Sequence, residues 1–241
     1  MTIEINRHRD IMIQVLKEIY ADTTIGPVLG FKGGTAAYLF YDLSRFSVDL
    51  DFDLLDSSKE DYVFEKVSSI LEKYGKFRDK YKKRYNLLFM ISYQKGFQGL
   101  KIEINRTKSI SKYQPQSFFG ISMLVMNKED MFANKLLAMT DRIGTANRDI
   151  FDVWFFLKNG WDFNAEIVKA RSGVSVAEFL EKSIAALETI EENDILAGLG
   201  ELLDAKQKDW VKTHLKEDAL FLLRLRLDNE QRNLKASQNQ Q

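Results

Sequence analysis

The chain contains 241 residues, which is long enough for one good-sized domain or two small ones with a real hydrophobic core. Hydrophobic residues make up 45% and charged residues 29%, as in an ordinary soluble globular protein. The 35 Lys and Arg residues balance the 35 Asp and Glu residues, which excludes nucleic-acid binding through bulk charge but not through a local basic patch. Because the chain has no cysteine and only two histidines, disulfides, thiolate metal sites, cysteine nucleophiles and His-rich zinc sites are excluded.

The sequence carries no sign of membrane insertion or export, and it predicts a cytoplasmic protein with no membrane partner. Residues 1–10 are polar and charged, unlike a signal peptide. The longest uncharged run, residues 113–127, is too short and too polar to span a bilayer.

The first half of the chain mixes helical and strand periodicities. A capping box formed by Ser57 and Glu60 is expected to start one of the helices. Helices are expected over residues 4–21, 36–41 and 57–74. Apolar runs and apolar–polar alternation predict strands over residues 28–31, 48–54, 87–93 and 100–105, with a turn at 96–99 and a strand or loop at 76–84.

From Asn127 onward the apolar spacing is helical, so we expect a change of architecture near residue 126 without a flexible linker. The polar residues after 227 are expected to be frayed. Helices are expected over residues 131–139, 148–157, 163–171, 176–191, 194–204 and 208–227. The sequence therefore predicts an α/β region over residues 1–126 and a helical region over 127–241.

The expected strand at 48–54 carries three carboxylates on one face, those of Asp49, Asp51 and Asp53. Their mutual repulsion costs energy, and a bound divalent cation would remove that cost. Two simpler interpretations compete. The strand could present a solvent face at a sheet edge. A calcium loop is the other, but Leu54 stands where such a loop needs glycine, and the interleaved apolar residues require a strand.

A glycine pair precedes this strand by about fourteen residues, in the segment Gly33-Gly34-Thr35. Glycines allow a sharp turn and a close approach of the backbone to a ligand. Thr35 would then begin a helix, whose N-terminal N–H groups favour phosphate. The pattern GxxxxGK[ST] is absent, so this is not a P-loop. Together the two elements predict an NTP substrate, with the glycine turn at the triphosphate and Mg²⁺ on the carboxylates.

Three segments share an order and spacing that resemble one known family. The first combines Gly33-Gly34-Thr35 with Arg45-Phe-Ser47-Val-Asp49-Leu-Asp51. The second is the acidic-to-lysine segment 128–138, and the third is Arg148-Asp149-Ile-Phe-Asp152. Together with Lys101-Ile-Glu103 they resemble the AbiEii/AbiGii toxins, which include the MenT toxins and belong to the polymerase-β-type nucleotidyltransferase superfamily. The matching segments span residues 31–154.

The resemblance implies a nucleotidyltransferase-like mixed sheet flanked by helices over residues 1–126. The helical region 127–241 would complete the active site with Lys135 and Asp149. It also implies a Mg²⁺-dependent nucleotidyltransferase acting as the toxin of a bacterial toxin–antitoxin pair. Such an enzyme would transfer a nucleotide from an NTP to an RNA acceptor, such as the 3′ end of tRNA, and its antitoxin would be encoded nearby.

In that framework Asp49 and Asp51 would bind the metal, because hard carboxylate oxygens suit Mg²⁺. Glu103 would activate the acceptor hydroxyl or complete the metal site, and its alternative is an outward charge on a strand. The segment Gly33-Gly34-Thr35 would bind the nucleotide.

Further nucleotide contacts are expected from the helical region. Lys135 would contact phosphate, although it could instead be a surface lysine over the core. Arg148 would contact phosphate or pair with Asp152 four positions later. Of the two neighbouring carboxylates, we prefer Asp149 over Asp152 as the functional acid, because it lies near the helix start.

A basic run lies between residues 73 and 84 and contains interleaved tyrosines, which could stack on bases. Charge runs are usually solvated, so a solvated hairpin is the alternative to an RNA-binding patch. The residues expected to contact RNA are Lys76, Arg78, Lys80, Lys82, Lys83 and Arg84.

Three other functions stay open from the sequence. One is an inactive nucleotide-binding or interaction module, although intact Asp49 and Asp51 argue against decay. Another is a small-molecule nucleotidyltransferase of the antibiotic-modifying kind, which the basic run disfavours. A protein hydroxyl could also replace RNA as the acceptor.

Overall fold

The computed structural model describes residues 4–94 and 99–238 of the chain. By its internal contacts the chain divides into two compact units, Met1–Asn127 (unit 1) and Lys128–Gln241 (unit 2). The boundary coincides with the change from mixed to helical periodicity.

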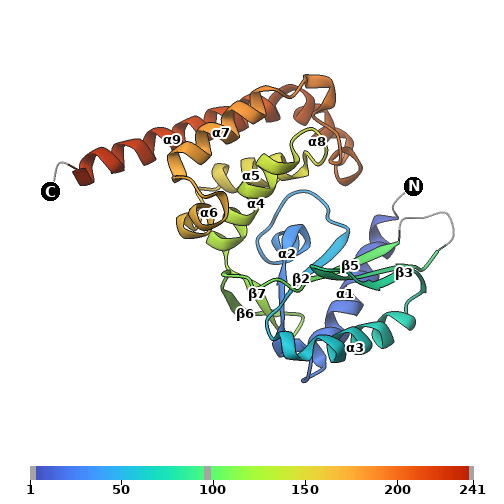
Figure 1. The fold of residues 1–241 in the computed structure, drawn as a ribbon. Coiled ribbons are helices and arrows are strands. Elements are labelled where there is room, and N and C mark those ends of the chain that lie inside the picture. The colour runs from blue at the N-terminus through green and yellow to red at the C-terminus, as the bar shows by residue number, and fades with distance from the viewer. Residues whose placement is uncertain (1–3, 95–98, 239–241) are drawn as a thin grey trace. The chain divides into compact units, whose positions relative to one another are not determined.

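Unit 1 is built on a seven-stranded mixed sheet with the order β3-β4-β5-β2-β1-β7-β6 (Figure 1). The central strands β1 and β2 are antiparallel, while β2 pairs with β5, and β1 with β7, in parallel. The strands are β1 (Leu29–Lys32), β2 (Asp49–Leu54), β3 (Lys76–Lys82), β4 (Asn86–Ser92), β5 (Leu100–Asn105), β6 (Tyr113–Phe118) and β7 (Ile121–Met126).

The α-helices in the described part of unit 1 are α1 (Ile5–Ala21), α2 (Gly33–Phe40) and α3 (Glu60–Glu72). Helix α1 buries an apolar stripe at helical spacing. Its Tyr20 ring lies 6.3 Å from the Phe52 ring of β2, and Phe64 of α3 lies 5.0 Å from Phe89 of β4. These two helices therefore pack on the sheet face that carries Phe52 and Phe89, which we call the apolar face. Each fully buried large side chain contributes about 1.5–3 kcal/mol to stability.

The hairpin of β6 and β7 was missed by the sequence reasoning, which treated residues 113–127 only as an uncharged run. It turns at Phe119 and Gly120, which both have positive φ. Of residues 76–84, for which the sequence predicts a strand or a loop, residues 76–82 form β3 and the last two lie beyond it. Most of the expected turn at 96–99 lies outside the described residues.

Two expected helix starts in unit 1 were wrong. Helix α2 begins at Gly33 rather than Ala36, so the glycines form its first turn. The capping box of Ser57 and Glu60 does not form. Instead the Asp56 carboxylate accepts from the Ser58 N–H and caps a short 3₁₀ turn, after which α3 begins at Glu60.

Unit 2 is helical, and its α-helices are α4 (Lys128–Arg142), α5 (Arg148–Lys158), α6 (Ala165–Ser172), α7 (Val176–Glu188), α8 (Ala205–Trp210) and α9 (Lys216–Gln238). The helix expected over 194–204 was wrong, because Gly198 and Gly200 interrupt it and only short 3₁₀ turns form there. The helix expected over 208–227 is divided by a π-helical turn at Val211–Leu215. The expected frayed end is instead helical to Gln238.

No helix in the described ranges is both long enough and apolar enough to cross a membrane.

Candidate active site

The three aspartates of β2 lie on one sheet face, as their alternation predicts, and the pairing of β2 with its neighbours surrounds them with polar residues. On the parallel strand β5, Asp49 is opposite Lys101, Asp51 is opposite Glu103, and Asp53 is opposite Asn105. On β1, Lys32 is opposite Asp51. We call this side of the sheet the carboxylate face.

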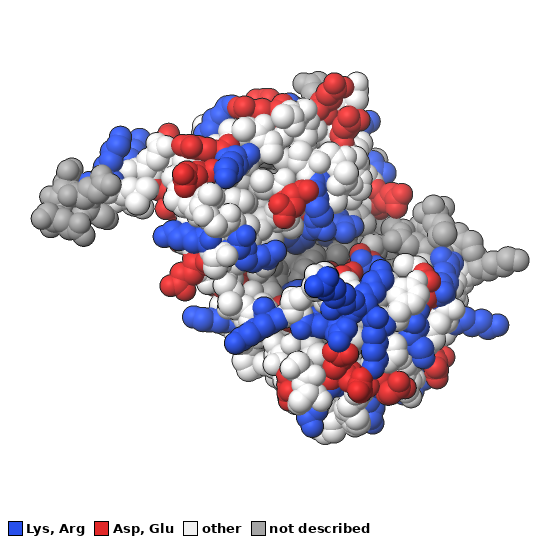
Figure 2. Space-filling model, in the orientation of Figure 1, with Lys and Arg blue, Asp and Glu red and all other residues white. Residues whose placement is uncertain are grey.

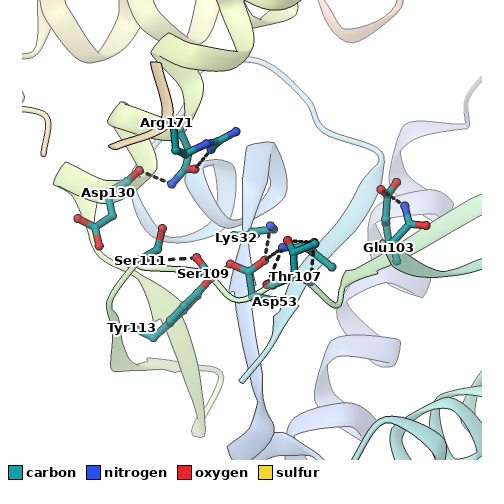
Figure 3. A network of polar contacts seen from close by, with 12 residues as sticks. Lys32, Asp53, Glu103, Thr107, Ser109, Ser111, Tyr113, Asp130 and Arg171 are labelled. Carbon is teal, nitrogen blue, oxygen red and sulfur yellow. Dashed lines mark hydrogen bonds and ion pairs between the residues drawn. The ribbon is translucent and has the colours of Figure 1, made fainter. Parts of the chain in front are cut away.

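Asp53 is fully occupied by structural contacts (Figure 3). The Lys32 ammonium and the Tyr113 hydroxyl bind its two oxygens, and the Asn105 amide donates to it over 2.8 Å. Burial alone would raise the pKa of Asp53, but Lys32 and the hydrogen bonds outweigh burial and lower it. The carboxylate is therefore an anchor that joins β2 to β1, β5 and β6.

The pKa of Asp51 is shifted in the opposite direction to that of Asp53. Burial and the neighbouring charge of Asp49 raise its pKa, and Lys101 and Lys32 only partly offset this. Asp49 is partly exposed, with the Lys101 ammonium 3.9 Å from its Oδ2 atom. Two close carboxylates without full neutralisation repel each other, so this pair has an electrostatic requirement for a further positive charge.

Glu103 is held by two neighbours on the same face. The Lys101 ammonium lies 3.0 Å from its Oε2 atom, and the Asn86 amide donates to its Oε1 atom. Burial alone would raise the pKa of Glu103, but Lys101 and Asn86 lower it. A carboxylate with a lowered pKa is a weak proton acceptor, so these contacts favour a positioning role, in which Glu103 holds Lys101 beside Asp49.

Gly33 joins the glycine turn to the carboxylates. Its φ is +81°, and a Cβ atom at this position would lie 2.5 Å from Oδ2 of Asp51. A side chain is therefore excluded twice, by the backbone conformation and by the Asp51 carboxylate. The first turn of α2 and Asp51 are in direct contact, as expected for elements that share a ligand.

This contact makes Gly33→Ala informative. The variant should lose most of the nucleotide transfer that the resemblance implies, because Asp51 must move, and positive φ should cost about 1 kcal/mol of stability. Gly120→Ala is the matched control, since Gly120 has φ +78° and open space around its Cβ position. It should show a similar stability loss and normal activity. Comparable activity in both variants would contradict the role of Gly33.

Thr35 and Gly34 fix the start of α2 to the start of β2. The Thr35 hydroxyl donates to the Asp49 carbonyl and lies 2.9 Å from the Ser47 hydroxyl. A Cβ atom on Gly34 would lie 2.9 Å from both the Arg45 guanidinium and the Ser47 hydroxyl. Arg45 is only 2% exposed and donates to the Phe46 carbonyl over 2.9 Å. Thr35 therefore holds Asp49 in position through a hydrogen bond to the backbone carbonyl of Asp49.

His8 is a second support that the sequence reasoning did not find. Its Nε2 atom lies 2.8 Å from the Val48 carbonyl oxygen, and its Nδ1 atom lies 2.5 Å from the Tyr93 hydroxyl. Because a carbonyl only accepts, Nε2 carries the proton and Nδ1 accepts from Tyr93. Burial lowers the pKa of His8, against the opposing effects of Val48 and Asp49. The neutral ring ties α1 to the residue before Asp49.

This lowered pKa gives a pH prediction. The folded pKa lies below the unfolded value of about 6.5, so His8 stabilises fully above that pH and its contribution is lost as pH falls toward the folded pKa. Urea unfolding should show a steeper decline below about pH 6.5 in wild type than in His8→Gln. His214→Gln, at the exposed histidine, is the control and should behave like wild type. Equal slopes in all three proteins would contradict the prediction.

Two of the site residues predicted in unit 2, Lys135 and Asp149, belong to one ion cluster. The Lys135 ammonium lies 2.9 Å from Asp149 Oδ1 and 2.6 Å from Asp152 Oδ2, and Arg142 lies 2.7 Å from Asp149 Oδ2. Both aspartates are fully buried. Lys135 thus binds both candidate acids rather than lying over the core, and the choice between Asp149 and Asp152 stays a prediction. Arg148 is half-buried at the start of α5.

The predicted RNA-contacting residues lie on β3, the edge strand of the sheet, and in the turn that follows it. Figure 2 shows many lysines and arginines exposed on the viewed face of unit 1. Lys80 and Lys82, however, lie over the Phe64 ring at 5.9 and 4.9 Å, and Lys82 pairs with Asp61. The basic residues of this run therefore lie in different environments.

Within the described residues, no group of three or more His, Cys, Asp or Glu side chains is arranged to hold a metal ion. Mg²⁺ often uses only one or two carboxylates and completes its shell with waters and substrate phosphates. The Asp49–Asp51 pair, with the raised pKa of Asp51, fits that donor set.

Lys32, Asn105 and Tyr113 were not identified from the sequence. Asn105 could have been, because it follows Glu103 by two residues on the same strand face. Lys32 could have been found from its place directly before the glycine pair. Tyr113 carried no local signal, since it lies 60 residues from Asp53.

The chain is similar to a known protein family and to solved structures. The family model of the AbiEii nucleotidyl transferase toxin of type IV toxin–antitoxin systems matches residues 14–218. Two Helicobacter pylori crystal structures share the fold with a TM-score of 0.62. JHP933 is 23% identical, with coverage of 99% of this chain and 100% of its own. A proposed nucleotidyltransferase is 24% identical, with coverage of 97% and 99%. No curated protein sequence gives a match.

Proposed function

This chain belongs to the AbiEii family of nucleotidyltransferase toxins, and on that premise we propose that it transfers a nucleoside monophosphate from an NTP to an RNA acceptor, such as the 3′ end of tRNA. The observation that carries the proposal is the Asp49–Asp51 pair, whose second carboxylate has a raised pKa and lies against Gly33 at the start of α2. A nucleotide bound there would meet a helix N-terminus and the metal-binding carboxylates together.

Asp49 and Asp51 would hold Mg²⁺, since the pair lacks full neutralisation by its own neighbours. When bound, Mg²⁺ supplies charge stabilisation to the attacking and leaving oxygens of phosphoryl transfer. Thr35 and His8 keep β2 in place for this role through the Asp49 and Val48 carbonyls.

The remaining residues divide into binding and positioning groups. The backbone N–H groups at Gly33, Gly34 and Thr35 would bind the triphosphate. Glu103 would orient the Lys101 ammonium beside Asp49. There the ammonium would face the incoming phosphate. The assignment of Lys135, Arg148 and Asp149 to nucleotide binding stays a prediction.

The family places this chain in a toxin–antitoxin system, so its counterpart is an antitoxin. We place the reaction in the cytoplasm, where NTPs and tRNA are found. The basic residues on and after β3 support RNA rather than a cationic small molecule as the acceptor.

The experiment incubates the purified protein with Mg²⁺, each of the four common NTPs labelled at the α-phosphate, and total bacterial RNA. We expect label on a tRNA-sized band, lost in Asp51→Asn and retained in Asp228→Asn, which changes an exposed carboxylate of α9. Label on protein alone would move the acceptor to a protein hydroxyl. Absence of any label would overturn the catalytic proposal.

A further inference from the structure

The sheet register extends the candidate site toward the basic edge of unit 1. Across five neighbouring strands, Lys32, Asp51, Glu103, Leu88 and Tyr81 are direct partners in one row. Partners in a row have side chains on the same face of a sheet. Adjacent strands lie about 4.8 Å apart, so Tyr81 is about 14 Å from Asp51 along the carboxylate face, which is the length of a few nucleotides.

The basic side chains of β3 are divided between the two faces of the sheet. Lys80 and Lys82 pair with the buried residues Phe89 and Leu87, so both belong to the apolar face and cover Phe64 of α3. A register shift between Phe77 and Asp79 makes a β-bulge at Arg78.

The bulge returns basic side chains to the carboxylate face. Arg78 donates to the Ser92 hydroxyl over 3.1 Å, and Lys76 is the direct partner of Ser92. Ser92 lies two positions after Met90 and four after Leu88, on the same face of β4. Lys76 and Arg78 therefore share the side of the sheet that carries Asp51 and Glu103.

The outer part of this face combines aromatic, apolar and cationic groups. Tyr81 is 42% exposed, and Leu88 and Met90 are half-buried. In the turn after β3, Tyr85 is 57% exposed with the Arg84 guanidinium 5.0 Å from its ring. Asp79 is the acidic residue on this part of β3, and it accepts a hydrogen bond from the Tyr81 hydroxyl. Exposed rings beside cations are the chemistry that binds single-stranded nucleic acid.

We propose that the single-stranded end of the RNA acceptor crosses the carboxylate face from Asp51 over Leu88 to Tyr81. A base stacks on Tyr81, and backbone phosphates bind Lys76 and Arg78. Lys80 and Lys82 do not take part, although they belong to the same basic run. This inference rests on the proposed function and specifies how its acceptor is bound.

The test compares the two faces of one strand. Binding of an end-labelled single-stranded RNA oligonucleotide is measured by fluorescence anisotropy over a series of salt concentrations. Tyr81→Ala should weaken binding about 5- to 100-fold, the range for loss of one base–aromatic stack. Arg78→Ala should weaken binding and reduce the salt slope by about one phosphate contact. The matched variants Lys80→Ala and Lys82→Ala should each stay within about twofold of wild type.

Two further measurements test whether a loss of RNA binding comes from the proposed RNA path rather than from damage to the fold or to the NTP site. Tyr81→Phe keeps the ring and loses the bond to Asp79, so it should bind RNA like wild type. NTP binding should be unchanged in all five variants. Equal losses in the Arg78 and Lys80 variants, or normal binding in Tyr81→Ala, would overturn the proposed path even if RNA labelling by wild type succeeds. Failure of wild type to label RNA would instead overturn the proposed function.

Discussion

Replacing Asp51 by asparagine should abolish nucleotide transfer and leave the fold at least as stable as wild type. In its proposed role as a metal ligand, the Asp51 carboxylate contributes several kcal/mol of transition-state stabilisation, so the rate should fall about a thousandfold or more. Stability should not fall with it, because the pKa of Asp51 is raised by burial and by Asp49. The carboxylate therefore destabilises the folded state at neutral pH, and replacing it by asparagine removes this destabilisation.

The matched control is Asp53→Asn, on the same strand and the same face. The pKa of Asp53 is lowered, so its ionised form stabilises the fold at pH values above the unfolded pKa of about 3.9 and this is lost as pH falls through the folded pKa. Neutralising it leaves the half-buried Lys32 without its charged partner, which costs up to about 3–5 kcal/mol.

Thermal and urea unfolding at pH 7 measure this pair directly. We expect the midpoint of Asp51→Asn at or above that of wild type and the midpoint of Asp53→Asn well below it. The wild-type protein should also gain stability from Asp51 as pH falls through the raised folded pKa toward the unfolded value of about 3.9, and Asp51→Asn should lack that gain. A large destabilisation by Asp51→Asn would show that its carboxylate is structural.

Replacing Lys135 by methionine should destabilise the protein by about 3–5 kcal/mol, because two buried carboxylates lose their shared cation. Methionine keeps most of the length of the side chain, so the loss comes mainly from charge rather than from a cavity. Lys169→Met, at an exposed lysine of α6, is the control and should change stability by less than about 0.5 kcal/mol. A midpoint near wild type for Lys135→Met would contradict the pairing.

A variant that neutralises the whole cluster separates structure from nucleotide binding. Lys135→Met combined with Asp149→Asn and Asp152→Asn removes the cation and both acids, so much of the lost stability should return. Binding of a fluorescent NTP analogue is then measured on a folded protein. Weakened binding would support the predicted phosphate contact of Lys135, whereas unchanged binding would show that Lys135 serves only the fold.

Some features of this protein follow from local geometry. The period of a strand places Asp49, Asp51 and Asp53 on one face whatever the rest of the chain does, and the helical stripe of α1 and the alternation of β5 predicted those elements closely. The family was indicated by the resemblance of the glycine turn, the acidic strand and two later segments to the AbiEii toxins, and the family model confirms it.

Contacts between distant segments were decided only by the tertiary structure. Asp53 differs from Asp51 because strand pairing brings it Lys32, Asn105 and Tyr113, the last from 60 residues away. One β-bulge divides the basic run between the two faces of the sheet, and the periodicity of the sequence does not predict that bulge. Lys135 meets two buried acids because α4 and α5 pack together. Periodicity is a property of the local backbone, whereas the neutralisation of each charge depends on register and packing, which are set by the whole fold.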